Sequence, residues 1–216
     1  MIEHLISEIS EQIQAAHEHE QAHGLMREHL RGQVNNLHRA IDIPAASPID
    51  SLMAFIDSYI DSVPEHLMAF NKLSKEADID DFIQPFINLA CAYFLKPPSI
   101  ITPETHVPST LEKTYLTQRL LEEVNDQVLA LSGAALAPLD MSMANIISYA
   151  IIGDEQANAL DHLVLLSLET ETKDQSVFEK RSVRKYMQKR KLDGWSDVHE
   201  KWPCFTKDIA VLVQIG

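Results

Sequence analysis

The sequence predicts an all-α protein, a single domain built as an antiparallel bundle of about eight helices. Residues that favour helices, such as Leu, Ile, Ala, Glu and Gln, dominate its 216 residues. Gly (six residues) and aromatic residues (6%) are scarce, although strand-rich proteins depend on aromatic residues and Gly-containing turns. Apolar residues recur every three to four positions along the chain, and no hairpin signal appears. The 45% hydrophobic content is enough for one well-buried core.

The first forty residues predict one long N-terminal helix, or two helices that meet near Gly24. The residue before Pro44 is biased away from helix, so this region ends by Ile43. Its apolar stripe at helical spacing consists of Ile2, Ile6, Ile9, Ile13, Ala16, Leu30, Val34 and Leu37.

Three further helices are predicted before residue 97. Ser47 followed by Pro48 is a typical helix start, and Pro64 begins the next helix. Asp78 is expected to cap a helix over 79–96, with a kink or restart at Pro85. Within it, residues 86–95 are apolar nearly all round, which predicts the central helix of the core.

The second half of the chain predicts shorter helices after a Pro/Thr/Ser-rich segment, 97–108. That segment is the best candidate for a long loop or a subdomain boundary within the single domain 1–216. Capping boxes at 109–112 and 176–179 are expected to open two helices, and Gly153 is expected to end another. The expected ranges are 109–131, 143–152, 154–169, 176–193 and 209–213.

Charge and composition restrict the partners and the compartment. A net charge of −14 repels nucleic acid and anionic lipid as a whole. The N-terminus lacks the basic start of a secretion signal, and the longest apolar run is about half of what a bilayer requires. Two cysteines, Cys91 and Cys204, do not form a disulfide framework. We therefore expect a cytoplasmic protein with reduced thiols.

A histidine-rich stretch is the first candidate site, since six of the ten histidines lie within the first 38 residues. His19-Glu20-Gln21-Ala22-His23 matches H-E-x-x-H, and with His29 it resembles the zinc metalloprotease signature over eleven residues. The resemblance implies zinc held by His19 and His23, with Glu20 activating its water. Met26 stands where the longer motif has Gly, and no predicted sheet would present a substrate, so we do not adopt the protease assignment.

Two other interpretations of the same stretch remain open. Glu20 and His23 form Glu-x-x-His, half of the ligand set of ferritin-like di-iron bundles, although no second such pair occurs. Alternatively, Glu20, His23 and Arg27 satisfy one another in an internal polar network. The candidate metal residues are therefore His19, Glu20 and His23, with zinc or iron as the cofactor.

A basic helix is the second candidate, because residues 180–191 hold seven of the eighteen basic residues. Val183, Tyr186 and Met187 form a narrow apolar stripe. The opposite side is cationic and is solvated, contacts an acidic partner or the protein's own acidic bundle, or binds nucleic acid. Its candidate interaction residues are Arg181, Arg184, Lys185 and Lys189.

An aromatic tail is the third candidate, with Trp195, Trp202, Pro203 and Phe205. It predicts either a subunit contact or a latch on the chain's own core.

No phosphate-binding loop, dinucleotide fingerprint or nucleophile motif is present. The leading hypothesis is a non-catalytic helical-bundle protein that acts through protein contacts, including self-association as a dimer. The alternative is a metal-dependent enzyme that uses residues 19–23.

Overall fold

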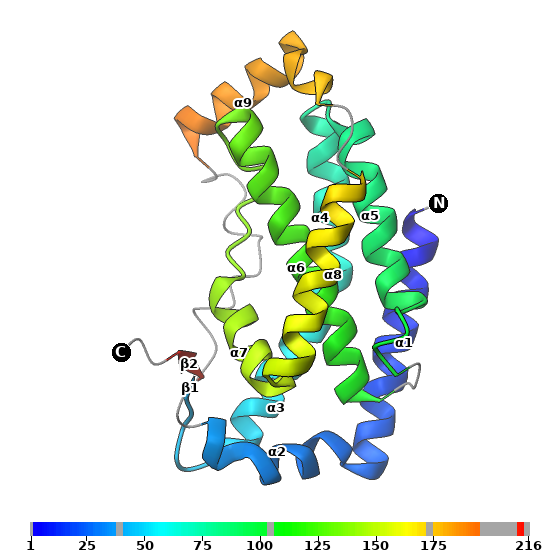
Figure 1. Ribbon diagram of the computed structural model, residues 1–216, viewed down its shortest axis with the longest axis vertical. Coiled ribbons are helices and arrows are strands. Elements are labelled where there is room, and N and C mark those ends of the chain that lie inside the picture. The colour runs from blue at the N-terminus through cyan, green and yellow to red at the C-terminus, as the bar shows by residue number, and fades with distance from the viewer. Residues whose placement is uncertain (1, 38–40, 103–105, 172–174, 195–210, 214–216) are drawn as a thin grey trace.

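The computed structural model describes residues 2–37, 41–102, 106–171, 175–194 and 211–213, and these form an all-α helical bundle (Figure 1). Helices account for nearly all of the described secondary structure, so the predicted fold class is confirmed. Their bounds are α1 Ile2–His23, α2 Leu25–Leu37, α3 Pro48–Asp61, α4 Val63–Glu76, α5 Asp80–Leu95, α6 Val107–Ser132, α7 Ser142–Ile152, α8 Asp154–Glu171, the 3₁₀ turn η1 Ser176–Glu179, and α9 Arg181–Asp193. Within these helices, none combines the length and the hydrophobicity needed to cross a membrane.

The centre of the bundle is α6, which contacts α1, α2, α3, α4, α5, α7 and α8. The expected central helix, α5, packs instead against α6, α4 and α1, and it leaves Asn88 and Ala92 exposed. A helix surrounded on all sides must bury whatever it carries, and α6 buries polar residues such as Thr114, Thr117 and Gln118 among its apolar ones. Because α6 mixes polar and apolar residues, its hydrophobicity alone does not indicate that it is the central helix.

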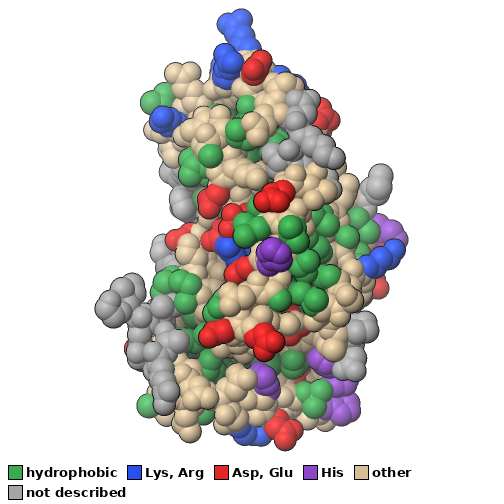
Figure 2. Space-filling model, viewed as in Figure 1, with side chains coloured by type: hydrophobic (Ala, Val, Ile, Leu, Met, Phe, Trp, Pro, Cys, Tyr) green, Lys and Arg blue, Asp and Glu red, His purple; other side chains and the backbone are tan. Residues whose placement is uncertain are grey.

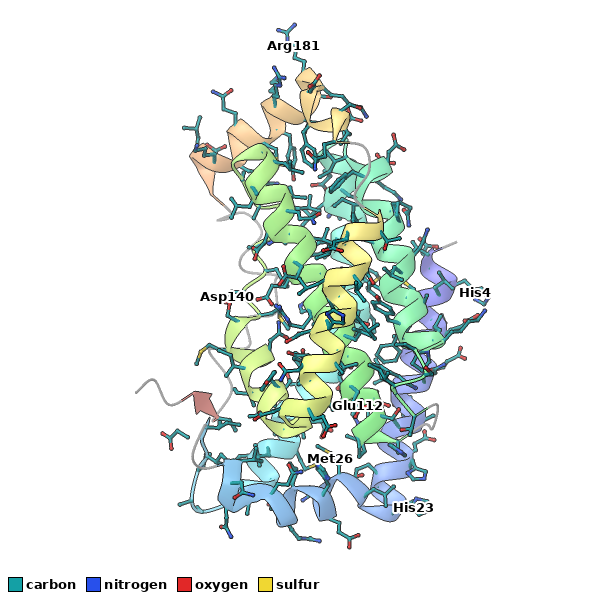
Figure 3. All side chains as sticks on the ribbon, in the orientation of Figure 1. His4, His23, Met26, Glu112, Asp140 and Arg181 are labelled. Carbon is teal, nitrogen blue, oxygen red and sulfur yellow. The ribbon has the colours of Figure 1, made fainter. Side chains whose placement is uncertain are left out.

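Gly24 joins α1 to α2 at a corner of the molecule, so the two-helix alternative holds. Its φ of +65° lies in the left-handed region, which glycine adopts without the steric cost of a Cβ. The predicted apolar stripe faces the core on both helices, with Ile9 and Leu30 fully buried. Figure 3 shows His23 and Met26 at this corner, at the opposite end of the molecule from Arg181.

Two predicted caps are replaced by other residues. Asp78 does not cap α5: it has a φ of +59°, and Ile79 is the N-cap. The Asp78 carboxylate instead accepts a hydrogen bond from the Ser182 hydroxyl at 2.5 Å, which ties α9 to the α4–α5 turn. The predicted capping box at 109–112 lies inside α6, because the His106 Nδ1 atom caps that helix by accepting the Ser109 N–H at 3.1 Å. Local residue type predicted that helices start here but not which residue caps them.

The C-terminal region departs from the expected helix over 209–213. Leu212–Val213 is a short strand, β2, which pairs antiparallel with β1 (Ile41–Asp42), with Ile41 opposite Val213. The predicted helix over 176–193 begins instead as η1 and continues as α9. Trp195, Trp202, Pro203, Phe205 and Cys204 lie outside the described residues.

Candidate functional site: a charged pocket between α6, α7 and α8

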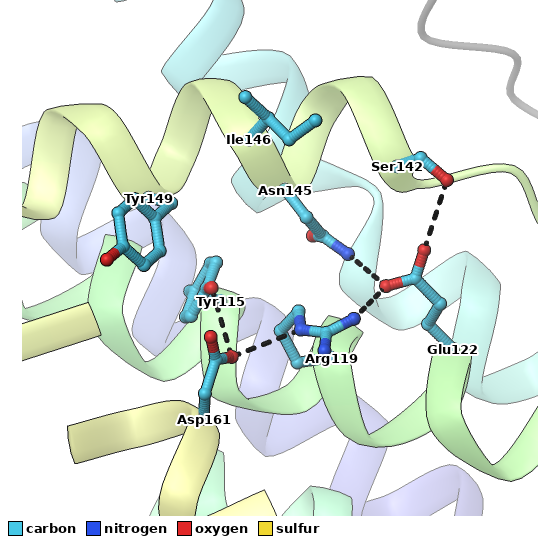
Figure 4. A pocket seen from close by; sticks show the side chains of 8 residues that line it. All are labelled: Tyr115, Arg119, Glu122, Ser142, Asn145, Ile146, Tyr149 and Asp161. Carbon is cyan, nitrogen blue, oxygen red and sulfur yellow. Dashed lines mark hydrogen bonds and ion pairs between the residues drawn. The ribbon is translucent and has the colours of Figure 1, made fainter. Parts of the chain in front are cut away.

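A pocket of about 450 Å³ opens where α6, α7 and α8 meet (Figure 4). Each helix contributes polar side chains to it, and most of them bond to one another. The lining residues are Tyr115, Arg119 and Glu122 from α6, Ser142, Asn145, Ile146 and Tyr149 from α7, and Asp161 from α8. A pocket of this size, with a few converging polar groups, is typical of a binding site.

Arg119 is the hub of the pocket. Its guanidinium pairs with Glu122, with Glu123 at 2.7 Å and, through Nε, with Asp161 at 3.1 Å. Burial disfavours the charged guanidinium, but the attraction of Glu122 and Asp161 outweighs it and raises the pKa of Arg119 further. Only 22% of the Arg119 side chain is exposed, so these pairs form in partial shelter from solvent.

Asp161 links α8 to α6 through a single carboxylate oxygen. That oxygen, Oδ1, accepts the Tyr115 hydroxyl at 3.0 Å and Arg119 Nε at 3.1 Å. Burial, and then the neighbouring Asp161 charge, raise the pKa of the Tyr115 phenol well above its usual value. Tyr115 therefore acts in this site as a neutral hydrogen-bond donor.

The rear of the pocket continues into a buried polar chain. Asn145 Nδ2 donates to Glu122 Oε2 at 2.8 Å, and Asn145 Oδ1 accepts the Tyr59 hydroxyl at 2.6 Å. Tyr59 is completely buried in α3, so the charged cluster extends by hydrogen bonds into the core. A network of this kind holds α3, α6 and α7 in one register because each lost bond would strand a buried polar atom.

A second buried polar group lies next to this chain, around His66. His66 Nδ1 and Gln118 Oε1 are 2.9 Å apart, and Gln118 Nε2 donates to Ser62 Oγ at 2.9 Å. Burial lowers the pKa of His66 from 6.5 to about 4, against the opposing effect of the Gln118 hydrogen bond. His66 is thus neutral at physiological pH.

Two exposed apolar side chains, here called the rim, lie on α7 and α8: Ile146 lines the pocket, and Leu165 follows the lining residue Asp161 on α8. Ile146 of α7 is 47% exposed, and Leu165, one turn beyond Asp161 on α8, is 52% exposed. Figure 2 shows acidic side chains gathered around a basic one in the middle of this face, with hydrophobic side chains beside them. The site therefore combines a charged centre with an apolar margin.

The three predicted metal residues lie at the α1–α2 corner. The Glu20 carboxylate accepts the backbone N–H groups of Met26 (2.8 Å) and Arg27 (3.1 Å), so it caps the start of α2. The His19 and His23 rings stack with centroids 4.2 Å apart, and His23 Nδ1 lies 2.9 Å from the His19 carbonyl oxygen. Among the described residues, no group of three or more His, Cys, Asp or Glu side chains is arranged to hold a metal ion. A metal at this corner stays a prediction.

The side chains of Glu20, His23 and Arg27 lie at the same corner but do not bond to one another as the predicted polar network required. Glu20 binds the backbone of Arg27 rather than its guanidinium, and that guanidinium donates instead to Asp50 at 2.6 Å. Beside it, His17 Nε2 lies 2.8 Å from Asp61 Oδ1. The polar groups here thus serve the junction of α1, α2 and α3.

The predicted basic face has the expected exposure. Val183 and Met187 are buried, whereas Arg181, Arg184, Lys185 and Lys189 are exposed on α9 at the end of the bundle opposite the α1–α2 corner. No described acidic side chain forms an ion pair with these four residues. The structure does not bring the basic face into the charged pocket.

The charged pocket itself was not predicted from the sequence. Neither Glu122 nor Asp161 belongs to any of the three candidate sites that the sequence predicts. The available signal was Arg119 followed by acids at positions +3 and +4, a spacing that places all three side chains on one helix face. No protein-family model matches this chain, and no significant match was found among curated proteins or solved structures.

Proposed function

We propose that this chain is a non-catalytic binding protein that contacts a protein partner through the face formed by α6, α7 and α8. The observation that carries the proposal is the half-exposed pair Ile146 and Leu165, which stand on two helices beside a charged pocket. Apolar side chains around converging polar groups are typical of interaction surfaces. The partner is either a different protein or a second copy of this chain.

The state of the polar groups favours binding over catalysis. A general base or nucleophile acts best when no counter-charge holds it in its charged form and when its pKa lies near the working pH. Glu122 and Glu123 are instead paired with Arg119, and the raised pKa of Tyr115 keeps its phenol protonated. These groups are arranged to hold a surface in shape.

Site-specific photo-crosslinking tests the proposal. A benzophenone side chain would replace Ile146 or Leu165, and Met68 of α4, which is 50% exposed, provides a matched apolar control. We expect a discrete adduct of one mass from both rim positions and none from position 68. An adduct of twice the monomer mass would identify a second copy.

Specificity is checked by changing the other rim residue. In the variant that carries benzophenone at position 146, the second change Leu165→Glu should abolish the adduct, because a carboxylate would be buried against an apolar contact. Equal adducts from all three positions, or adducts that survive Leu165→Glu, would overturn the proposed contact face.

A further inference from the structure

We propose that the α6–α8 pocket receives a Lys or Arg side chain from the protein partner. This inference rests on the proposed function and adds the chemistry that the partner must present. It follows from the charge of the pocket, the oxygen atoms left open inside it, its aromatic walls and its apolar rim.

The charge of the pocket is unbalanced. Among the lining residues, the acids Glu122 and Asp161 outnumber the base Arg119, which also pairs with Glu123. The side chains of Glu122, Glu123 and Asp161 are 14%, 28% and 30% exposed, which limits the screening of their charge by water. An incoming cation would therefore be attracted, whereas an anion would be repelled by the excess carboxylates.

Acceptor oxygens remain open toward the pocket. Asp161 uses Oδ1 for both Tyr115 and Arg119, and its Oδ2 accepts no hydrogen bond from the described residues. Of the side chains in the described part of the chain, only the Ser142 hydroxyl reaches Glu122 Oε1, at the long distance of 3.5 Å. In Figure 4, Asp161 projects from α8 into the space next to Tyr115 and Arg119. An ammonium or guanidinium group supplies the donors that these oxygens lack.

Aromatic walls suit the same kind of ligand. Tyr115 and Tyr149 line the pocket, and the face of a Tyr ring attracts a nearby cation. Ile146 lies at the mouth, where it can pack against the methylene stem of a long basic side chain. The volume of about 450 Å³ is ample for such a side chain.

The rim favours a polypeptide over a free amine. A small amine inside the pocket would leave Leu165 and much of Ile146 in water, since Leu165 does not line the pocket and Ile146 is 47% exposed. A peptide carrying a basic side chain between apolar ones would cover the rim and fill the pocket together. Interfaces are organised in this way, with an anchor side chain inserted and its neighbours excluding water.

Peptide titrations provide the test. The probes are blocked pentapeptides with Lys, Arg, norleucine or Glu between two Leu residues, and n-butylammonium chloride as a free amine. Binding is followed by the methyl NMR signals of Ile146 and Leu165 in the full chain. We expect the Lys or Arg peptide to bind at least tenfold more tightly than the norleucine peptide and than n-butylammonium, and the Glu peptide not to bind.

Two variants and a control locate the effect. Asp161→Asn keeps an acceptor for Tyr115 but removes the charge, and it should weaken the Lys peptide at least tenfold. Ile146→Lys places an ammonium group at the mouth from an exposed position, so it should block binding without affecting the fold. Glu155→Gln removes one exposed charge from another face of α8 and should leave the affinity unchanged.

The outcomes separate this inference from the proposed function. Equal affinity for the Lys and norleucine peptides would overturn the cationic anchor while the contact face survives. Equal affinity for n-butylammonium and the Lys peptide would overturn the polypeptide ligand. If no peptide binds but the rim crosslinks pass their control, the cationic anchor would be overturned and the partner contact would stand. Failure of both experiments would remove the contact face itself.

Discussion

The α1–α2 corner and the α6–α8 pocket are both rich in polar groups, but they satisfy them in different ways. At the corner, Glu20 binds backbone N–H groups only six and seven residues away. In the pocket, Arg119 and Asp161 meet across 42 residues of sequence, and Tyr59 and Asn145 across 86. The corner closes a local turn, whereas the pocket depends on several helices packing together. The H-E-x-x-H motif therefore marks the region whose polar contacts are local in sequence, not the region that several helices build together.

The largest effect is expected from His66, beside the pocket and absent from the histidine-rich stretch. Its pKa is lowered to about 4, so the unfolded chain takes up a proton below pH 6.5 that the folded chain does not accept until about pH 4. Stability from this residue is complete above pH 6.5 and falls by roughly 3 kcal/mol on acidification to pH 4.

Urea unfolding across that pH range measures the effect. The difference between wild type and His66→Gln isolates this residue from the carboxylates that titrate in the same window. A difference that does not change between pH 6.5 and pH 4 would contradict the assignment.

The next largest effect is expected from Arg119→Met. Removal of the guanidinium leaves Glu122, Glu123 and Asp161 facing one another without their counter-charge. Because 22% of the Arg119 side chain is exposed, we expect a loss of about 2 kcal/mol, below the range for fully buried pairs. Chemical denaturation measures it, with the exposed Arg184→Met as the control. Adding Asp161→Asn should restore part of the loss, and no restoration would count against the network.

At the corner, Glu20→Ala should cost about 1.5 kcal/mol, because two N–H groups at the start of α2 lose their acceptor. Glu11→Ala, an exposed position on α1, is the matched control. Thermal unfolding with and without EDTA also sharpens the comparison. If chelation lowers the stability of wild type but not of Glu20→Ala, then Glu20 is a metal ligand rather than only a cap.

The smallest effect is expected from Gly24→Ala, at about 1 kcal/mol of destabilisation. The φ of +65° at this position is unfavourable for any residue with a Cβ, although no atom lies within 4 Å of the added carbon. Gly32→Ala is a control of opposite sign: it lies within α2 with open space around it, and it should stabilise the helix by a few tenths of a kcal/mol or more. Unchanged or increased stability of Gly24→Ala would contradict the role of backbone conformation at this position.

Much of the helical layout could be predicted from single residues. Pro48 begins α3 and Gly153 ends α7, as expected from a ring that fixes φ and a residue that tolerates a φ of +95°. The cationic side of α9 also followed from its spacing, since Val183 and Met187 had to face the core. The caps predicted at Asp78 and at 109–112 were wrong, because several nearby residues could serve and packing chose Ile79 and His106 instead.

The sequence by itself predicted the apolar side of the main helices, and hence that the chain is a helical bundle, with a break at Gly24 as one of two alternatives for its first forty residues. Only the tertiary structure decided that α6 is the centre and that Arg119, Asn145 and Asp161 share a pocket. Periodicity along one helix shows which side is hydrophobic but not which neighbour it packs against, because the hydrophobic effect is non-directional. Hydrogen bonds and ion pairs are directional and short, so their partners are set only once three helices hold their final positions.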